Sequence, residues 1–89
     1  MLDKTLKALS DSTRREILRA LRGGDLTAGE ISARFPMTAA SVSHHLSVLK
    51  DAGLVSVERD GRNQIYTLEA TVLQELLQEM VGLFDREER

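Results

Sequence analysis

Two adjacent histidines, His44 and His45, are the first residues in this sequence that suggest chemistry. They lie in a stretch with helical periodicity, where neighbouring residues point about 100° apart, so they cannot chelate one metal ion as an i, i+4 pair would. Ser41 and His45 do have the i, i+4 spacing, and a hydrogen bond between them would be a first step toward an activated nucleophile. The sequence supplies no third group to orient the histidine and no oxyanion pocket, so we expect no catalysis here.

A pair of carboxylates is the other arrangement that could do acid–base chemistry. Glu75 and Glu79 are spaced i, i+4, but both lie on the polar face of an amphipathic segment. That position favours a solvated surface over a general acid–base pair. The chain has no cysteine, which excludes disulfides, thiolate metal sites and redox-sensing thiols. We therefore expect that the protein is not an enzyme.

The stretch around the two histidines suits DNA recognition better than catalysis. It carries small and hydrogen-bonding side chains where most surface helices carry Glu and Lys. A slim polar helix fits the major groove, where Ser and His can donate or accept hydrogen bonds and an Ala methyl can touch a thymine methyl. The alternative is a small-residue helix packed beneath another helix, but Val42, Leu46 and Leu49 already supply a full apolar stripe on the opposite face. The DNA-contacting residues expected on this helix are Thr38, Ala39, Ala40, Ser41, Ser43 and His44.

The elements around this helix follow the order of a winged helix-turn-helix. Thr27-Ala28-Gly29-Glu30 fits a capping box that begins a short helix over residues 27–34. Pro36 ends that helix, and the next helix runs over residues 38–52 before a glycine. Residues 27–52 are therefore predicted as the helix-turn-helix unit.

Residues 54–68 are predicted to form the wing, a two-stranded hairpin. The residues before Asp60-Gly61 alternate and are rich in β-branched side chains, and the residues after it can return antiparallel. Asp60-Gly61 predicts a type I′ turn, in which both central residues need a positive φ.

Three residues outside the second helix are expected to contact the DNA backbone. Thr27 lies at a helix N-terminus, where free N–H groups favour an anion, although it could serve as an N-cap alone. Arg59 and Arg62 bracket the hairpin tip and could lie against phosphates or enter the minor groove, or could be the solvated charges of a turn.

Apolar stripes predict further helices over residues 2–9, 12–22 and 70–85. Arg14 projects from the apolar side of its helix, where we expect a partly buried ion pair. The apolar face of the last helix covers about half its circumference, which is more than a small domain of short elements can bury. Part of that face should therefore meet another subunit.

Length and charge set the remaining bounds. Eighty-nine residues make one small domain, residues 1–89, which is marginally stable alone. The net charge is −2, but residues 1–68 hold ten Lys and Arg against eight Asp and Glu, whereas residues 69–89 hold two against six. The acid is thus concentrated away from the predicted recognition helix. The sequence lacks a signal-peptide pattern and a membrane-spanning run, which predicts a cytoplasmic protein without membrane insertion.

The chain resembles the ArsR family of bacterial repressors over almost its whole length. The stretches that carry the resemblance are residues 8–18 (ALSDSTRREIL), residues 41–55 (SVSHHLSVLKDAGLV) and residues 59–66, with RDGR and Ile65-Tyr66. Their combination is more specific than any one of them. Ser12 stands where the family typically has proline, which slightly alters the chemistry of the helix start.

The resemblance implies a fold that is mostly α with a small β-hairpin, in the order ααααββα. It implies a palindromic operator, with Ser43 and His44 at the DNA bases, and a homodimer joined through the first and last helices, residues 2–9 and 70–85. The expected dimer-interface residues are Leu2, Leu6, Val72, Leu73, Leu76, Met80, Leu83 and Phe84.

The well-known metal sites of the family are missing from this sequence. One such site uses Cys-x-Cys at the start of the third helix, and the other uses Asp-x-His with His-x-x-His in the last helix. The matching positions are Thr27 and Gly29 for the first site, and Ala70, Val72, Leu83 and Arg86 for the second. Neither group is a competent ligand set, so we expect no metal and no cofactor.

Within the family, the chain is most similar to the short, cysteine-free autorepressors. The sequence therefore predicts a metal-independent repressor that binds double-stranded DNA and regulates its own promoter. Two alternatives keep the fold: a sensor whose unidentified effector acts at the dimer interface, and a repressor sequestered by a protein partner through its acidic last helix. Release from DNA by an effector, or capture that depends on Glu75 and Glu79, would separate them.

Overall fold

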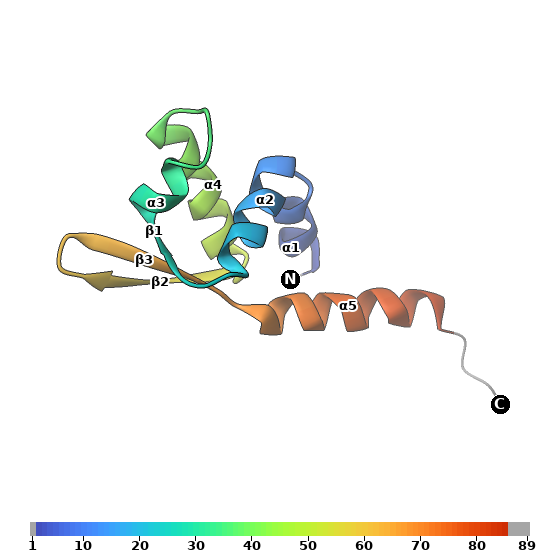
Figure 1. The fold of residues 1–89 in the computed structure, drawn as a ribbon. Helices are drawn as coiled ribbons and strands as arrows, with labels where there is room; N and C mark the ends of the chain where they lie inside the picture. Colours follow the sequence, from blue (N-terminus) through green and yellow to red (C-terminus); the bar gives the residue numbers. More distant parts are fainter. Residues whose placement is uncertain (1, 86–89) are drawn as a thin grey trace.

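The computed structural model describes residues 2–85, and Met1 and residues 86–89 lie outside the described part (Figure 1). Arg86, one of the four positions that match the family's second metal site, is therefore not described. Within residues 2–85 the elements are α1 (Leu2–Leu9), α2 (Ser12–Leu21), β1 (Leu26–Thr27), α3 (Ala28–Ser32), α4 (Ala39–Asp51), β2 (Val55–Asp60), β3 (Asn63–Leu68) and α5 (Ala70–Phe84). This order confirms the predicted winged helix-turn-helix, which is mostly helical. The wing and α5 extend in opposite directions from the body, so the molecule is elongated, 57 × 24 × 21 Å (Figure 1).

The sheet has three strands, in the order β1-β3-β2, instead of the predicted two. The additional strand β1 pairs antiparallel with β3, with Leu26 opposite Tyr66 and Thr27 opposite Ile65. Two residues are too few to show an alternating pattern, so the sequence carried no signal for this strand. The pairing joins the N-terminus of α3 directly to the wing.

Side-chain caps begin both helices of the helix-turn-helix, as predicted. At α3 the capping box is complete, because the Glu30 N–H donates to Thr27 Oγ1 (3.1 Å) and the Thr27 N–H donates to Glu30 Oε1 (2.8 Å). At α4 the Ser41 N–H donates to Thr38 Oγ1 over 3.1 Å. These bonds satisfy backbone donors that the first turn of a helix leaves free, so each helix starts at a fixed residue.

A glycine in the left-handed region ends α4. Gly53 has a φ of +77°, and its N–H donates to the Lys50 carbonyl (2.9 Å). The Leu54 N–H donates to the Leu49 carbonyl (3.0 Å), which completes a Schellman motif. Leu49 and Leu54 are fully buried, so the motif also anchors the helix end in the core.

The wing turn differs from the predicted type I′. Asp60 pairs with Asn63, so the two-residue turn is Gly61-Arg62. Gly61 has a φ of +64°, whereas no residue other than glycine has a positive φ within residues 2–85. A positive φ at the first central residue alone fits a type II′ turn, for which one glycine suffices.

The core lies where α2, α3, α4 and the sheet meet. The apolar stripe of α4 is buried as predicted, and burying each such leucine or valine contributes about 1.5–3 kcal/mol relative to exposure. The largest fully buried side chains are Ile17, Ile31, Val42, Leu46, Leu49 and Leu54. No helix among residues 2–85 is long and apolar enough to cross a membrane.

Candidate DNA interface

The predicted recognition helix, α4, turns one face to the core and the other to solvent. Behind the outer face, Val42 and Leu46 are each 2 % exposed. The predicted contact residues Thr38, Ala39, Ala40, Ser41, Ser43 and His44 are all exposed. The structure therefore excludes the alternative that this face packs beneath another helix of the chain, and it leaves the hydrogen-bonding groups of Ser43 and His44 accessible.

The Ser41–His45 pairing considered for nucleophile activation does not form. Ser41 Oγ instead accepts a hydrogen bond from Thr38 Oγ1 over 3.1 Å, next to the helix cap. His45 is half-buried, and its Nδ1 lies 3.2 Å from Nη1 of Arg14 on α2. The two histidine rings of α4 are 5.9 Å apart and tilted by 54°, consistent with their expected divergence.

Arg14 has different partners from those predicted. Its Nε donates to the Ala8 carbonyl (2.7 Å) and its Nη2 donates to the Lys7 carbonyl (3.0 Å), both at the end of α1. The expected partly buried ion pair was wrong, because carbonyl oxygens and His45 surround the guanidinium. Asp11 caps α2 instead, and its carboxylate accepts the Arg14 N–H over 3.0 Å.

That cap bond is the main reason why the pKa of Asp11 lies below its ordinary value. Burial opposes the shift, and the nearby His45 and Arg14 side chains add to it. On the sheet, burial of Tyr66 raises the pKa of its phenol. Neither group lies on the exposed face of α4, so these shifts concern the scaffold.

The three residues predicted to contact the DNA backbone come together although they are far apart in the sequence. Thr27, Arg59 and Arg62 line one polar hollow of about 180 Å³ between the start of α3 and the outer part of the wing. Both arginines are exposed. The backbone N–H of Thr27 is already bonded within the capping box, so its confirmed role is that of an N-cap. The pairing of β1 with β3 creates this hollow, because it brings the start of α3 beside the wing.

The predicted dimer residues fall into two groups. Val72 and Leu73 pack against the core and Leu76 is only 9 % exposed, so these three serve the chain's own packing. The outer turns of α5 are different: Leu83 is 73 % exposed and Phe84 is 78 % exposed. Among residues 2–85 the other exposed large apolar residues are Leu6, Leu77, Met80 and Val81. Leu77 and Val81 were not among the predicted interface residues, although they belong to the same apolar stripe.

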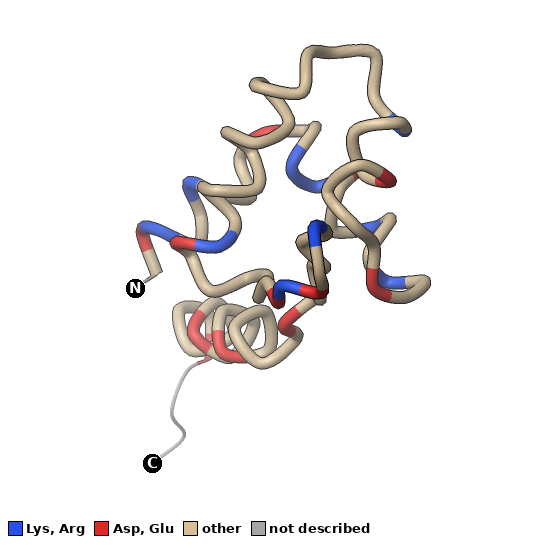
Figure 2. Tube along the Cα trace, turned by 90° about the vertical axis from the view of Figure 1, so that its left-hand side faces the viewer, with Lys and Arg blue, Asp and Glu red and all other residues tan. Residues whose placement is uncertain are grey.

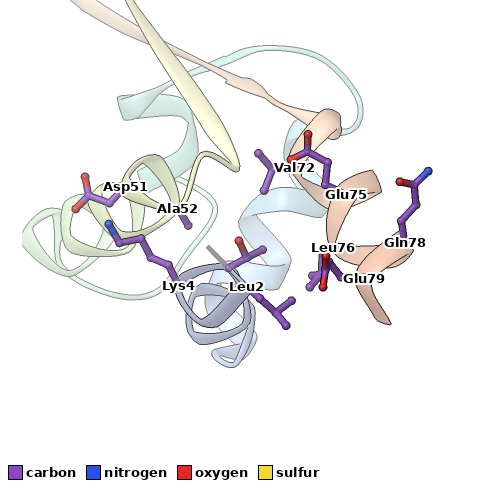
Figure 3. Close-up of a pocket in the computed structure, with 10 residues that line it drawn as sticks. Leu2, Lys4, Asp51, Ala52, Val72, Glu75, Leu76, Gln78 and Glu79 are labelled. Atoms are coloured by element: carbon purple, nitrogen blue, oxygen red, sulfur yellow. The ribbon is translucent and has the colours of Figure 1, made fainter. Parts of the chain in front are cut away.

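An open groove of about 970 Å³ lies between α1, the end of α4 and α5 (Figure 3). Leu2 of α1 and Val72 and Leu76 of α5 line it, with Glu75 and Glu79 also along α5 (Figure 3). Helix α5 carries these two glutamates and no Lys or Arg, as its red bands in Figure 2 show. The acid of α5 is thus separated from the exposed face of α4.

A capped helix with an exposed polar face, a second helix before it and a hairpin beside it define a winged-helix DNA-binding protein. The family model for bacterial regulatory proteins of the arsR family matches residues 11–57. The transcriptional repressor SdpR of Bacillus subtilis is 42 % identical over 96 % of this chain and 94 % of its own length. The chain therefore belongs to the ArsR family; it is a transcription regulator and not an enzyme.

Solved structures agree with this family. A possible transcriptional regulator for arsenical resistance superposes with a TM-score of 0.83 at 31 % identity, covering 93 % of this chain and 86 % of that one. A solution structure from Mycobacterium bovis, described as a homodimeric winged helix-turn-helix DNA-binding domain, has a TM-score of 0.75 at 28 % identity. It covers 97 % of this chain and 81 % of that one.

Proposed function

We propose that this protein is a metal-independent, sequence-specific repressor that binds a palindromic operator as a homodimer and represses its own promoter. The observation that carries the proposal is the outer face of α4. Its small, uncharged, hydrogen-bonding side chains are exposed, and the buried stripe and the caps at both ends hold the helix in place.

Base recognition falls to the first turns of α4. The N-terminal residues of a recognition helix reach base edges in the major groove. Ser43 and His44 supply donors and acceptors there, and the methyl groups of Ala39 and Ala40 fit against thymine methyls. Few direct contacts are available, so we expect DNA shape and deformability to contribute to specificity.

Backbone contacts fall to the wing. Arg59 and Arg62 project near Thr27 around one hollow, which suits a phosphate beside the major groove. The guanidinium groups supply the charge there, and the Thr27 hydroxyl supplies a further polar group.

The dimer supplies the second recognition helix. The outer apolar residues of α5, with Leu83 and Phe84 the most exposed, would be costly to leave in water. The related M. bovis domain is described as homodimeric, which supports the same arrangement here. In such a dimer the two α4 helices should lie about 34 Å apart, one turn of DNA.

Metal independence is supported by the residues at the family's sensor positions. Thr27 and Gly29 stand at one site and Ala70, Val72 and Leu83 at the other, and none is a good ligand for a transition metal. Within residues 2–85 no three His, Cys, Asp or Glu side chains are grouped as a metal site would require.

Selection of bound sequences from random duplex DNA, with a chelator present, tests the proposal. We expect an enriched inverted repeat whose half-sites are centred about one helical turn apart. Enrichment only after zinc or another metal is added would contradict metal independence. A lack of enrichment in both conditions would contradict sequence-specific binding.

An effector-responsive sensor is a second candidate, and the groove beside α5 is the observation that favours it. A small molecule bound there would contact α1, α4 and α5 together. Release of the selected DNA by a dialysable component of cell extract would support the sensor. Release only by a macromolecular component would point instead to a protein that sequesters the repressor.

A further inference from the structure

His45 is a polar residue of α4 that lies off the base-contacting face. It follows Ser43 and His44 directly, yet only 16 % of its side chain is exposed. The imidazole is half-buried on the side of α4 that otherwise carries leucine and valine, and burying a polar group there costs free energy unless it is hydrogen-bonded. The contact of His45 with Arg14 supplies that hydrogen bond.

A single guanidinium joins three helices at this point. Arg14 belongs to α2, and its Nε and Nη2 donate to the carbonyls of Ala8 (2.7 Å) and Lys7 (3.0 Å) at the end of α1. Its Nη1 lies 3.2 Å from Nδ1 of His45 on α4. The Arg14 backbone is fixed in turn, because its N–H donates to the Asp11 cap. The planar fork therefore contacts α1 and α4 in a fixed relative orientation.

The chemistry of the pair assigns the tautomer of His45. A guanidinium has donors and no acceptor, so Nδ1 of His45 must accept the hydrogen bond and the ring proton lies on Nε2. Asp11 Oδ2 is 3.8 Å from the same Nδ1 and competes only when that nitrogen carries a proton. In this arrangement Nδ1 of His45 accepts a hydrogen bond from Nη1 of Arg14.

We propose that Arg14 and His45 are positioning residues that set the rotation of the recognition helix relative to α1. Burial of Leu46 and Leu49 holds α4 against the core, but apolar burial has no preferred direction. A hydrogen bond from a fixed guanidinium is directional, so it can set the rotation of the helix. Because α1 also contacts α5, the bridge connects the proposed dimer helices to the base-contacting residues. The inference rests on the proposed function, and it explains how the orientation of α4 maintains the preference for one DNA sequence.

The first test compares His45→Asn with His45→Leu. The carbonyl oxygen of Asn can take the place of Nδ1 as an acceptor, whereas Leu fills similar space without one. We expect His45→Leu to reduce the ratio of specific to non-specific DNA affinity about tenfold, the value of one charge-assisted hydrogen bond, and His45→Asn to retain most of it. Arg14→Lys should resemble His45→Leu, because one ammonium cannot span the three acceptors.

Two controls separate positioning from simple destabilisation. Thermal unfolding of each variant, followed by circular dichroism, shows whether it is folded at the temperature of the DNA measurement. In the double variant Arg14→Lys/His45→Leu the loss of specificity should be no larger than in Arg14→Lys alone, since that variant already lacks the bond to His45. Additive losses would overturn the bridge.

Imidazole ¹⁵N NMR at alkaline pH gives a readout that needs no DNA. In the wild type, Nδ1 of His45 should be unprotonated and Nε2 protonated, and Arg14→Lys should change the proportion of the two tautomers. A protonated Nδ1 in the wild type, or identical spectra, would overturn the inference. If the wild type fails to distinguish operator from scrambled DNA, the proposed function fails, and the NMR result still decides the bridge.

Discussion

A Cβ placed on Gly53 would lie 3.2 Å from Cγ2 of Val72, which is closer than ordinary van der Waals contact, so the end of α4 and the start of α5 are tightly packed. Gly53 also has a φ of +77°, a conformation that other residues rarely adopt. Glycine at this position therefore suits both the left-handed end of the recognition helix and its tight packing against the proposed dimer helix.

Gly53→Ala should therefore destabilise the protein. The left-handed backbone alone costs about 1–2 kcal/mol, and the contact with Val72 adds to it. Urea unfolding measures the change in the free energy of unfolding. Gly82→Ala on α5 is the matched control, because its Cβ would meet nothing within 4 Å, and it should stabilise the helix by about 0.5–1 kcal/mol. Equal effects of the two substitutions would contradict this description.

His44→Ala should weaken binding to the operator more than binding to scrambled DNA. A good side-chain contact to a base contributes about 1–3 kcal/mol of discrimination, so the affinity ratio should fall roughly tenfold or more. Ser47→Ala, one turn further along α4, is the control and should have a smaller effect, since N-terminal residues reach the bases. Equal losses on both DNAs would remove His44 from base recognition.

Arg62→Ala should lower the salt dependence of DNA binding. Removing one phosphate contact reduces the slope of log affinity against log salt concentration by about 0.9. The measurement is a salt titration of the wild type and the variant on the same DNA. Arg19→Ala is the control, because Arg19 is exposed on α2 and paired with Glu16. If the slope stays unchanged in Arg62→Ala, the wing tip is a solvated turn.

Leu83→Glu should shift the protein from dimer to monomer. Leu83 is 73 % exposed in the single chain, so the substitution leaves the fold of the chain intact while it places a charge in the proposed interface. Sedimentation equilibrium reports the assembly, and Gln78→Glu on the polar side of α5 controls for the added charge. A dimer that persists in Leu83→Glu would place the interface elsewhere.

Asp11 should make the stability of the protein depend on pH in the acid range. The bond from the Arg14 N–H lowers the pKa of the folded carboxyl, so its contribution is fully present above the unfolded pKa. It should decline as the pH falls through the lowered folded pKa. Asp11→Asn keeps a cap acceptor but cannot titrate, and its unfolding free energy should fall less on acidification. Parallel pH profiles would exclude this contribution.

Local chemistry was enough to predict most of the elements. Thr27 and Thr38 as caps and Gly53 as a helix stop each act within a few residues, and the structure has all three in those roles. The buried stripe of α4 likewise follows from helical periodicity alone. These features decide where the exposed face of the recognition helix lies, so its residues could be predicted.

Features that depend on distant partners could not be predicted. Strand β1 exists because Leu26 meets Tyr66 across the fold, and neither residue signals the other in the sequence. The unusual position of Arg14 was visible, but its carbonyl and His45 partners come from two other helices. The sequence likewise could not show which turns of α5 are exposed. That depends on how far the helices and strands of the core reach along α5.

The central claim is that α4 gives this protein sequence-specific affinity for DNA without a metal. Fluorescence anisotropy at fixed salt, with a chelator present, would compare labelled DNA from upstream of the protein's own gene with scrambled DNA of equal length. We predict tighter binding to the upstream DNA, saturating at one dimer per site, and loss of that preference in His44→Ala. Equal affinity for both DNAs, or a preference that His44→Ala retains in full, would contradict the account.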